Sequence, residues 1–173
     1  GWYWFVGDDA VLHPRFREET MLKELGAIPQ TDCVLCRPVL GSDNWIRHIA
    51  GSVEAAEDGL SKALGAAFEA AQSRGVVPEA GAVRNRRVAV ACADFLGLSR
   101  SCLERVLEPW KRCARERIYV EAAVPNTLLS LARSPLFVDD FIWDGTAKPG
   151  NWRELAARLV ASGTAVFAHP IKL

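Results

Sequence analysis

The sequence predicts one compact, mainly α-helical domain over residues 1–173, with marginal short strands at its two ends. A chain of 173 residues is long enough to bury one substantial hydrophobic core. Half of its residues are hydrophobic and 24% are charged, as in ordinary globular domains. Apolar residues recur at spacings of three and four along most of the chain, which is the helical period. Since no apolar run approaches the roughly 20 residues that span a bilayer, we expect no membrane association.

The N-terminal half is expected to form one strand and two helices. Residues 2–6 alternate aromatic and β-branched types and predict a strand. Apolar residues at helical spacing predict a helix over 14–25 and a long helix over 44–72. The type of the short apolar segment 33–40 is left open.

The C-terminal half is expected to be a series of helices. Five segments combine helical periodicity with capping or helix-ending residues: 88–96, 100–108, 110–123, 127–133 and 152–161. Pro109 suits the first turn of a helix, and Asn151 suits an N-cap. Residues 136–143 can form a strand or an aromatic-rich loop, and residues 164–168 a closing strand.

Residues 88–108 have the pattern of two helices joined by a tight turn. Ala93 is small enough to let two helices cross closely, and Gly97 permits the left-handed backbone that the turn requires. Ser99 can cap the second helix, which would begin at Arg100. Apolar residues such as Leu103 would hold the two helices together. We therefore predict a helix-turn-helix at about residues 88–108.

This segment resembles the helix-turn-helix signature of bacterial and phage regulators at Ala93, Gly97, Leu98, Ser99, Leu103 and Val106. The resemblance implies that the second helix enters the major groove of DNA. The Ala/Arg/Gly-rich composition is also similar to that of the DNA-binding domain of alphaherpesvirus major immediate-early transcriptional regulators. That similarity implies a dimeric transcription factor in the host nucleus. A bacterial regulator would instead be cytoplasmic.

The distribution of charge favours the same function. The chain as a whole is neutral. Residues 84–117 contain nine basic and four acidic residues, a net charge of +5, so the remaining residues carry −5. Positive charge next to the motif is what a duplex-binding surface requires.

The predicted site lies on the second helix and on both sides of it. Exposed residues near the helix start are the candidates for base contacts: Arg100, Ser101, Glu104 and Arg105. Residues around them are the candidates for phosphate contacts: Arg84, Asn85, Arg86, Arg87, Ser99, Lys111, Arg112 and Arg115. The sequence thus predicts a sequence-specific double-stranded DNA-binding domain of a transcriptional regulator, acting as a homodimer. We expect no catalytic residues, no metal ion and no cofactor.

Two other functions are open. A protein-interaction or assembly domain would use the basic helical face to bind an acidic partner. A fragment of a metal-dependent polymerase would use Asp8 and Asp9, because adjacent aspartates after a strand hold two metal ions in such enzymes. That function also needs a third carboxylate on a neighbouring strand. The simplest interpretation of Gly7-Asp8-Asp9 is a turn.

The five cysteines include one close pair, Cys33 and Cys36. An odd number argues against a disulfide scaffold and suits a reducing compartment. Cys33-x-x-Cys36 followed by His48 is the first half of a zinc-site spacing, with His13, His169 or a distant cysteine as the possible fourth ligand. The usual second pair is absent, so whether Cys33, Cys36 and His48 bind zinc is left open.

Overall fold

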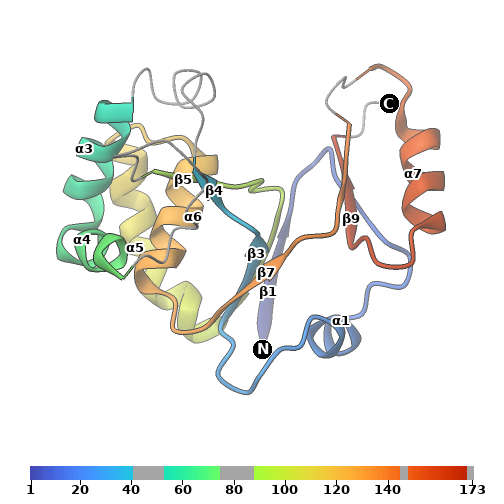
Figure 1. The fold of residues 1–173 in the computed structure, drawn as a ribbon, viewed down its shortest axis with the longest axis horizontal. Helices are drawn as coiled ribbons and strands as arrows, with labels where there is room; N and C mark the ends of the chain where they lie inside the picture. The colour runs from blue at the N-terminus through green and yellow to red at the C-terminus, as the bar shows by residue number, and fades with distance from the viewer. Residues whose placement is uncertain (41–52, 75–87, 145–147, 171–173) are drawn as a thin grey trace.

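The computed structural model describes residues 1–40, 53–74, 88–144 and 148–170, and these form a mixed α/β fold (Figure 1). The prediction of a mainly α-helical domain is wrong, because strands from both halves of the chain build multi-stranded sheets through the molecule. In Figure 1 helices α3 to α6 lie on one side and α7 and β9 on the other, with the largest sheet between them. Among the described helices, none combines the length and apolar character needed to cross a membrane.

The central sheet has the strand order β1-β6-β3-β7. Its strands are β1 (Trp2–Val6), β6 (Phe95–Ser99), β3 (Cys33–Cys36) and β7 (Pro135–Val138). Strand β6 is antiparallel to both of its neighbours, and β3 is parallel to β7. The carboxyl ends of β1, β3 and β7 therefore meet the start of β6 at one edge of the sheet.

Strands β3 and β6 of this sheet are buried on both faces. Leu35, Leu98 and their neighbours on one face pack against α5 (Arg100–Arg115) and α6 (Val120–Leu131). Val34 and Phe95 on the other face pack against α1 (Glu18–Glu24) and strand β9 (Phe167–His169). The alternation follows from the two-residue period of a strand.

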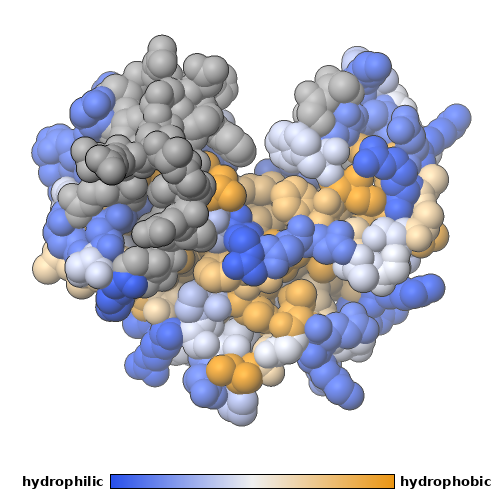
Figure 2. All heavy atoms as spheres, viewed as in Figure 1, coloured by the Kyte–Doolittle hydropathy of each residue, from blue (hydrophilic) through white to orange (hydrophobic). Residues whose placement is uncertain are grey.

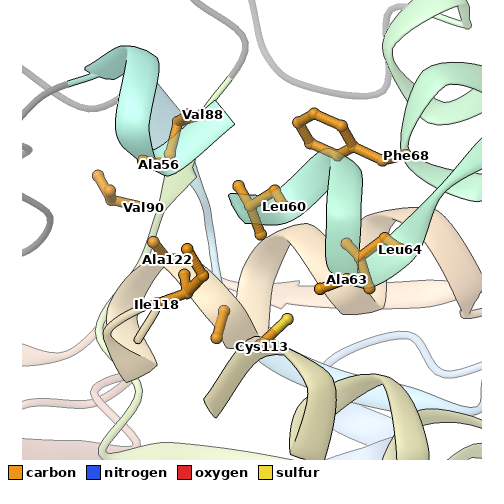
Figure 3. Packing of buried hydrophobic residues seen from close by; sticks show 11 residues of the cluster. Ala56, Leu60, Ala63, Leu64, Phe68, Val88, Val90, Cys113, Ile118 and Ala122 are labelled. Carbon is orange, nitrogen blue, oxygen red and sulfur yellow. The ribbon is translucent and has the colours of Figure 1, made fainter. Parts of the chain in front are cut away.

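Two smaller units flank the central sheet. Strand β9 pairs with β2 (Val11–Leu12) and with β8 (Ile142–Trp143), and α7 (Trp152–Ala161) packs on them. On the opposite side, α3 (Val53–Leu64) and α4 (Ala66–Ser73) pack against α5 and α6 (Figure 3). Near them, β4 (Val39–Leu40) pairs with β5 (Ala89–Val90).

The predicted helix over 88–96 is wrong, and with it the helix-turn-helix. Residues 89–90 are strand β5, and residues 95–99 are strand β6. A strand buried on both faces has a continuous apolar run that periodicity cannot separate from a buried helix. Gly97 has no positive φ and forms no turn. It lies opposite Trp4 in the sheet, where a Cβ would come within 2.4 Å of the indole ring.

Two prolines that were expected to separate helices lie inside them. Helix α5 continues through Pro109 to Arg115, and α6 contains Pro125, so the predicted helices over 110–123 and 127–133 are wrong in their bounds. Pro125 has no N–H to donate to the carbonyl of Glu121. The Ala91 backbone N–H donates to that carbonyl instead, at 3.0 Å, so the proline links α6 to the segment after β5.

Other local predictions are confirmed in part. Strand 2–6 and helix 152–161 have the predicted bounds, although the Asn151 side chain donates to Asp144 and to the Pro170 carbonyl and does not cap the helix. Helix α1 is shorter than 14–25. The described part of the predicted helix 44–72 divides into α3 and α4 at Gly65, whose φ is +57°. Segments 33–40 and 136–143 both form short strands.

Candidate metal centre

A cluster of metal-binding side chains lies at the edge of the central sheet where β1, β3 and β7 end. Asp9 belongs to the turn after β1, in which the Ala10 N–H donates to the Gly7 carbonyl at 3.1 Å. Cys92 and Asp94 come directly before β6, and His169 is the last residue of β9. The cluster thus combines the segment after β1, the segment before β6 and the end of a strand from the smaller sheet.

Pairing of the small sheet brings His169 to this edge. Strand β2 follows the Asp9 turn and pairs with β9, with Val11 opposite Ala168. His169 is 9% exposed, and its Nδ1 lies 3.0 Å from Asp9 Oδ1 without the alignment of a hydrogen bond. Its Nε2 lies 3.3 Å from Asp94 Oδ2. The imidazole thus lies between two carboxylates.

Cys92 completes the cluster. Its Sγ donates to Asp94 Oδ2 at 3.4 Å, and the donor atoms of Cys92, Asp94 and His169 all lie within 4.8 Å of one another. Around a tetrahedral Zn²⁺ ion, nitrogen and oxygen ligands lie about 3.3 Å apart and sulfur and oxygen ligands about 3.5 Å apart, because the Zn–N and Zn–O bonds are about 2.0 Å and Zn–S about 2.3 Å long. The spacings of Cys92 Sγ and of His169 Nε2 from Asp94 Oδ2 match these values, and the sulfur and the ring nitrogen lie within 4.8 Å of each other.

Gly7 makes room for one of these donors. A Cβ at this position would lie 2.4 Å from Asp94 Oδ1 and 2.9 Å from Asp94 Cβ. The Gly7 N–H also donates to the Asp94 carbonyl at 2.9 Å. The glycine at the end of β1 therefore lets the Asp94 side chain lie against the strand end, facing Cys92 and His169.

A cleft of about 460 Å³ opens beside the cluster. It is lined by Cys36 at the end of β3, by Ala91 and Cys92 before β6, and by Phe141 and Trp143 after β7. Figure 2 shows a notch between the two sides of the molecule, with hydrophobic residues on its floor. Since Cys92 is both a cluster residue and a wall residue, and the Trp143 ring lies 5.2 Å from the His169 ring, the cleft adjoins the cluster.

The charged residues of the cleft pair with each other. Arg37 follows β3 and Asp139 follows β7, and their side chains form a two-pronged ion pair whose Nη2–Oδ2 distance is 2.7 Å. This contact lowers the pKa of Asp139 and raises the pKa of Arg37. The Arg37 guanidinium also lies 5.1 Å from the centre of the Phe137 ring. The described lining of the cleft therefore offers no unpaired charge.

The two cysteines of the predicted zinc-site spacing lie on opposite faces of β3. Cys33 packs with Cys102 under α5, whereas Cys36 faces the cleft, because residues three apart in a strand point to opposite sides. The pKa of the Cys36 thiol is raised, first by its contact with Cys92 and then by burial. Cys33 and Cys36 cannot chelate one ion, and His48 lies outside the described residues.

The predicted base-contact residues lie on the first turns of α5 without a partner helix before them. Ser99 caps α5 as predicted, since its Oγ accepts from the Cys102 N–H at 3.2 Å. Ser101 Oγ lies 3.2 Å from that same hydroxyl, and exposed Arg100 donates to Glu104 at 2.9 Å. The predicted start and N-cap of α5 are confirmed. The side chains of Arg100 and Ser101, which were predicted to contact bases in a DNA groove, instead contact neighbouring side chains of α5 and its cap.

Arg105 has a structural role. It forms an ion pair with Asp32, a carboxylate that is 5% exposed and also accepts from the backbone N–H groups of Arg133 and Ser134. Its Nε donates to the Leu131 carbonyl at 3.4 Å. Arg105 therefore connects α5 to the start of β3 and to the segment before β7, and its guanidinium is not free to read a base.

The predicted phosphate contacts are dispersed. Arg112 donates to the Ala63 carbonyl of α3 at 2.7 Å, Lys111 pairs with Glu108, and Arg115 is exposed in the last turn of α5. Arg84, Asn85, Arg86 and Arg87 lie outside the described residues. Binding of duplex DNA stays a prediction, but the motif on which it depended is not formed.

Sequence reasoning missed the cluster because it assigned residues 88–96 to a helix. A cysteine and an aspartate two residues apart, directly before a buried strand, were the available signal, together with Gly7-Asp8-Asp9 after another strand. Asp94 adds a carboxylate next to the turn that contains Asp9, directly before β6. Comparison with protein-family models, curated proteins and solved structures gives no match to this chain.

Proposed function

We propose that this chain is a zinc-dependent hydrolase whose metal ion is bound by Cys92, Asp94 and His169. The observation that carries the proposal is the convergence of a thiol, a carboxylate and an imidazole nitrogen, whose two distances to Asp94 Oδ2 are those of ligands around a tetrahedral zinc ion. Sulfur and nitrogen donors favour zinc over magnesium or calcium, which prefer oxygen ligands. This proposal departs from the sequence-based expectation of a chain without catalysis or metal.

Asp9 would orient the histidine ligand. A histidine that binds zinc through one ring nitrogen commonly donates its other N–H to a carboxylate, which fixes the tautomer and the ring direction. Asp9 Oδ1 is 3.0 Å from His169 Nδ1, and Nδ1 has no aligned partner among the described groups. A small rotation of the imidazole toward the metal would complete both contacts.

Three protein ligands favour a catalytic site. Structural zinc ions have four protein ligands, whereas catalytic ions keep one position for water or substrate. The described residues supply three converging donors, and the cleft lies beside them. A zinc ion held by these three residues would supply a nucleophile at neutral pH, because zinc lowers the pKa of a water molecule that it binds to about 7. Hydrolysis of an ester or amide is the reaction class that this arrangement supports best.

The test is a zinc titration of the metal-free chain by calorimetry, followed by cobalt substitution. We expect one zinc ion per chain and a thiolate-to-cobalt absorption band that Cys92→Ser removes. Asp94→Asn and His169→Gln should abolish tight binding, and Asp9→Asn should weaken it about 10- to 100-fold. Asp8→Asn and His13→Gln are matched controls, because Asp8 is exposed and His13 Nδ1 accepts from the Arg15 N–H. Binding that survives both ligand substitutions would overturn the proposal.

Hydrolysis provides a second readout. The zinc-loaded chain should hydrolyse neutral esters at neutral pH, and a chelator should remove this activity reversibly. Activity that persists in the metal-free chain would assign the reaction to another site.

A further inference from the structure

The cleft has the size of a small-molecule site. Its volume of about 460 Å³ lies in the lower part of the range of roughly 300–1,000 Å³ that is typical of ligand pockets. Cys92, which lines the cleft, is also a ligand of the proposed zinc ion. A molecule bound in the cleft would thus lie next to the metal.

The walls of the cleft are apolar and partly aromatic. Val39 contributes exposed aliphatic surface, and Phe141 and Trp143 contribute rings. Val90, Ala91 and Val138 lie behind this surface and are at most 5% exposed. The Phe141 ring stacks on the buried Phe167 ring at 4.9 Å, which fixes its position. The large Trp143 side chain is 50% exposed. A half-exposed indole beside a fixed phenyl ring offers a surface on which a flat apolar group can stack.

The charges of the described residues that line the cleft exclude an anionic substrate. The one cation there, Arg37, is held by Asp139 through two contacts. Binding a phosphate or carboxylate at Arg37 would leave Asp139 unpaired and close to the new negative charge. A neutral ligand leaves this ion pair intact.

We infer that the cleft binds the aromatic acyl group of a neutral ester or amide and directs its carbonyl to the zinc ion. The reaction rests on the proposed function above, whereas the preference for a neutral aromatic group rests on the cleft alone. Water adds to the carbonyl carbon, the bond to the leaving alcohol or amine breaks, and that leaving group takes one proton. No oxidant or further reactant is required.

The experiment separates binding from reaction. Binding of phenylacetamide, a neutral aromatic amide, is measured by calorimetry on the zinc-loaded chain and compared with succinamate, an anionic amide without a ring. Hydrolysis of methyl phenylacetate is compared with that of methyl acetate by proton release. We expect phenylacetamide to bind and succinamate not to bind. We also expect kcat/KM for the aromatic ester to be about 100-fold higher, as for apolar groups that fill a hydrophobic pocket.

Two variants locate the site. Trp143→Ala should weaken phenylacetamide binding about tenfold by removing one stacking surface. Trp152→Ala is the matched control, because Trp152 is 39% exposed on α7 and does not line the cleft. Ala91→Trp should block binding by filling the cleft, and its circular dichroism spectrum establishes whether the chain remains folded.

The outcomes distinguish the two proposals. Zinc binding without phenylacetamide binding overturns the substrate assignment and leaves the metal site. Phenylacetamide binding that Trp143→Ala weakens, in a chain that binds no zinc, overturns the hydrolase and retains the aromatic site. The inference about the cleft is overturned if succinamate and phenylacetamide bind with equal affinity. It is also overturned if Trp143→Ala and Trp152→Ala bind phenylacetamide with equal affinity.

Discussion

The Asp32–Arg105 ion pair gives a quantitative test of the role of α5. If the side chain of Arg105 served to contact a DNA base, it would not be needed for folding. In the structure it is the charged partner of a carboxylate whose side chain is 8% exposed, while the Arg105 side chain is 27% exposed. Arg105→Ala should therefore destabilise the fold, because a buried charge loses its counterion.

The magnitude follows from the surroundings of Asp32. Removing one partner of a buried ion pair costs about 3–5 kcal/mol. The N–H groups of Arg133 and Ser134 still donate to the carboxylate, at 3.1–3.2 Å, and Arg105 is itself partly exposed. We therefore expect the low end of the range, about 3 kcal/mol. For a chain of this size, that corresponds to a fall in Tm of about 6–12 °C.

Urea and thermal unfolding followed by circular dichroism measure this change. Arg100→Ala is the matched control, because the Arg100 side chain is 76% exposed and pairs with exposed Glu104 one turn along the helix. Its Tm should remain that of the unsubstituted chain. If Arg105→Ala is as stable as Arg100→Ala, the structural role of Arg105 is refuted and its availability to a nucleic acid becomes open again. A double-mutant cycle with Asp32→Asn should return a coupling energy above about 1 kcal/mol.

Two further predictions concern the sheet and its edge. Gly97→Ala should lower the free energy of unfolding by about 1–3 kcal/mol, because the new Cβ would lie 2.4 Å from the Trp4 ring. Gly163→Ala is the control, since Gly163 has open space around it. Equal unfolding midpoints for the two variants would contradict the assigned packing. The ion pair with Arg37 lowers the pKa of Asp139 in the folded chain. The stabilisation that the pair gives to the fold is therefore complete above the carboxyl pKa of the unfolded chain, about 3.9, and is lost as the pH falls through the lower pKa of the folded chain. Because both side chains are about half exposed, the contribution of the ion pair to stability should stay below about 1 kcal/mol. The stabilities of Asp139→Asn and of the unsubstituted chain, compared from pH 7 to pH 2, should differ by an amount that disappears only in acid. A difference that is constant with pH would contradict this prediction.

The parts of the fold that could be predicted are those set by neighbouring residues. Strand 2–6 follows from a local alternation of side chains, and helix 152–161 from its apolar period. The start of α5 follows from Ser99, whose hydroxyl is within three residues of the N–H that it caps. Such contacts form inside one segment, so the sequence of that segment is sufficient to predict them.

The candidate site could be predicted only in fragments. The turn after β1 was recognised, and Asp9 was singled out for metal chemistry. Cys92 and Asp94 were assigned to a helix, because a run of small and apolar residues suits a buried strand as well as a buried helix. Their proximity to Asp9 depends on the pairing of β6 with β1, which joins segments about 90 residues apart.

The amino-acid sequence by itself determined where α5 begins and where β1 lies. Only the tertiary structure decided that residues 95–99 are a strand, because their hydrogen-bond partners belong to β1 and β3, which lie far away in the N-terminal part of the chain. The tertiary structure likewise decided that Arg105 forms an ion pair with Asp32. It also decided that the pairing of β2 with β9 brings His169 close to Asp9 and Asp94. Local signals fix local geometry, whereas the chemistry at this sheet edge depends on contacts between distant segments.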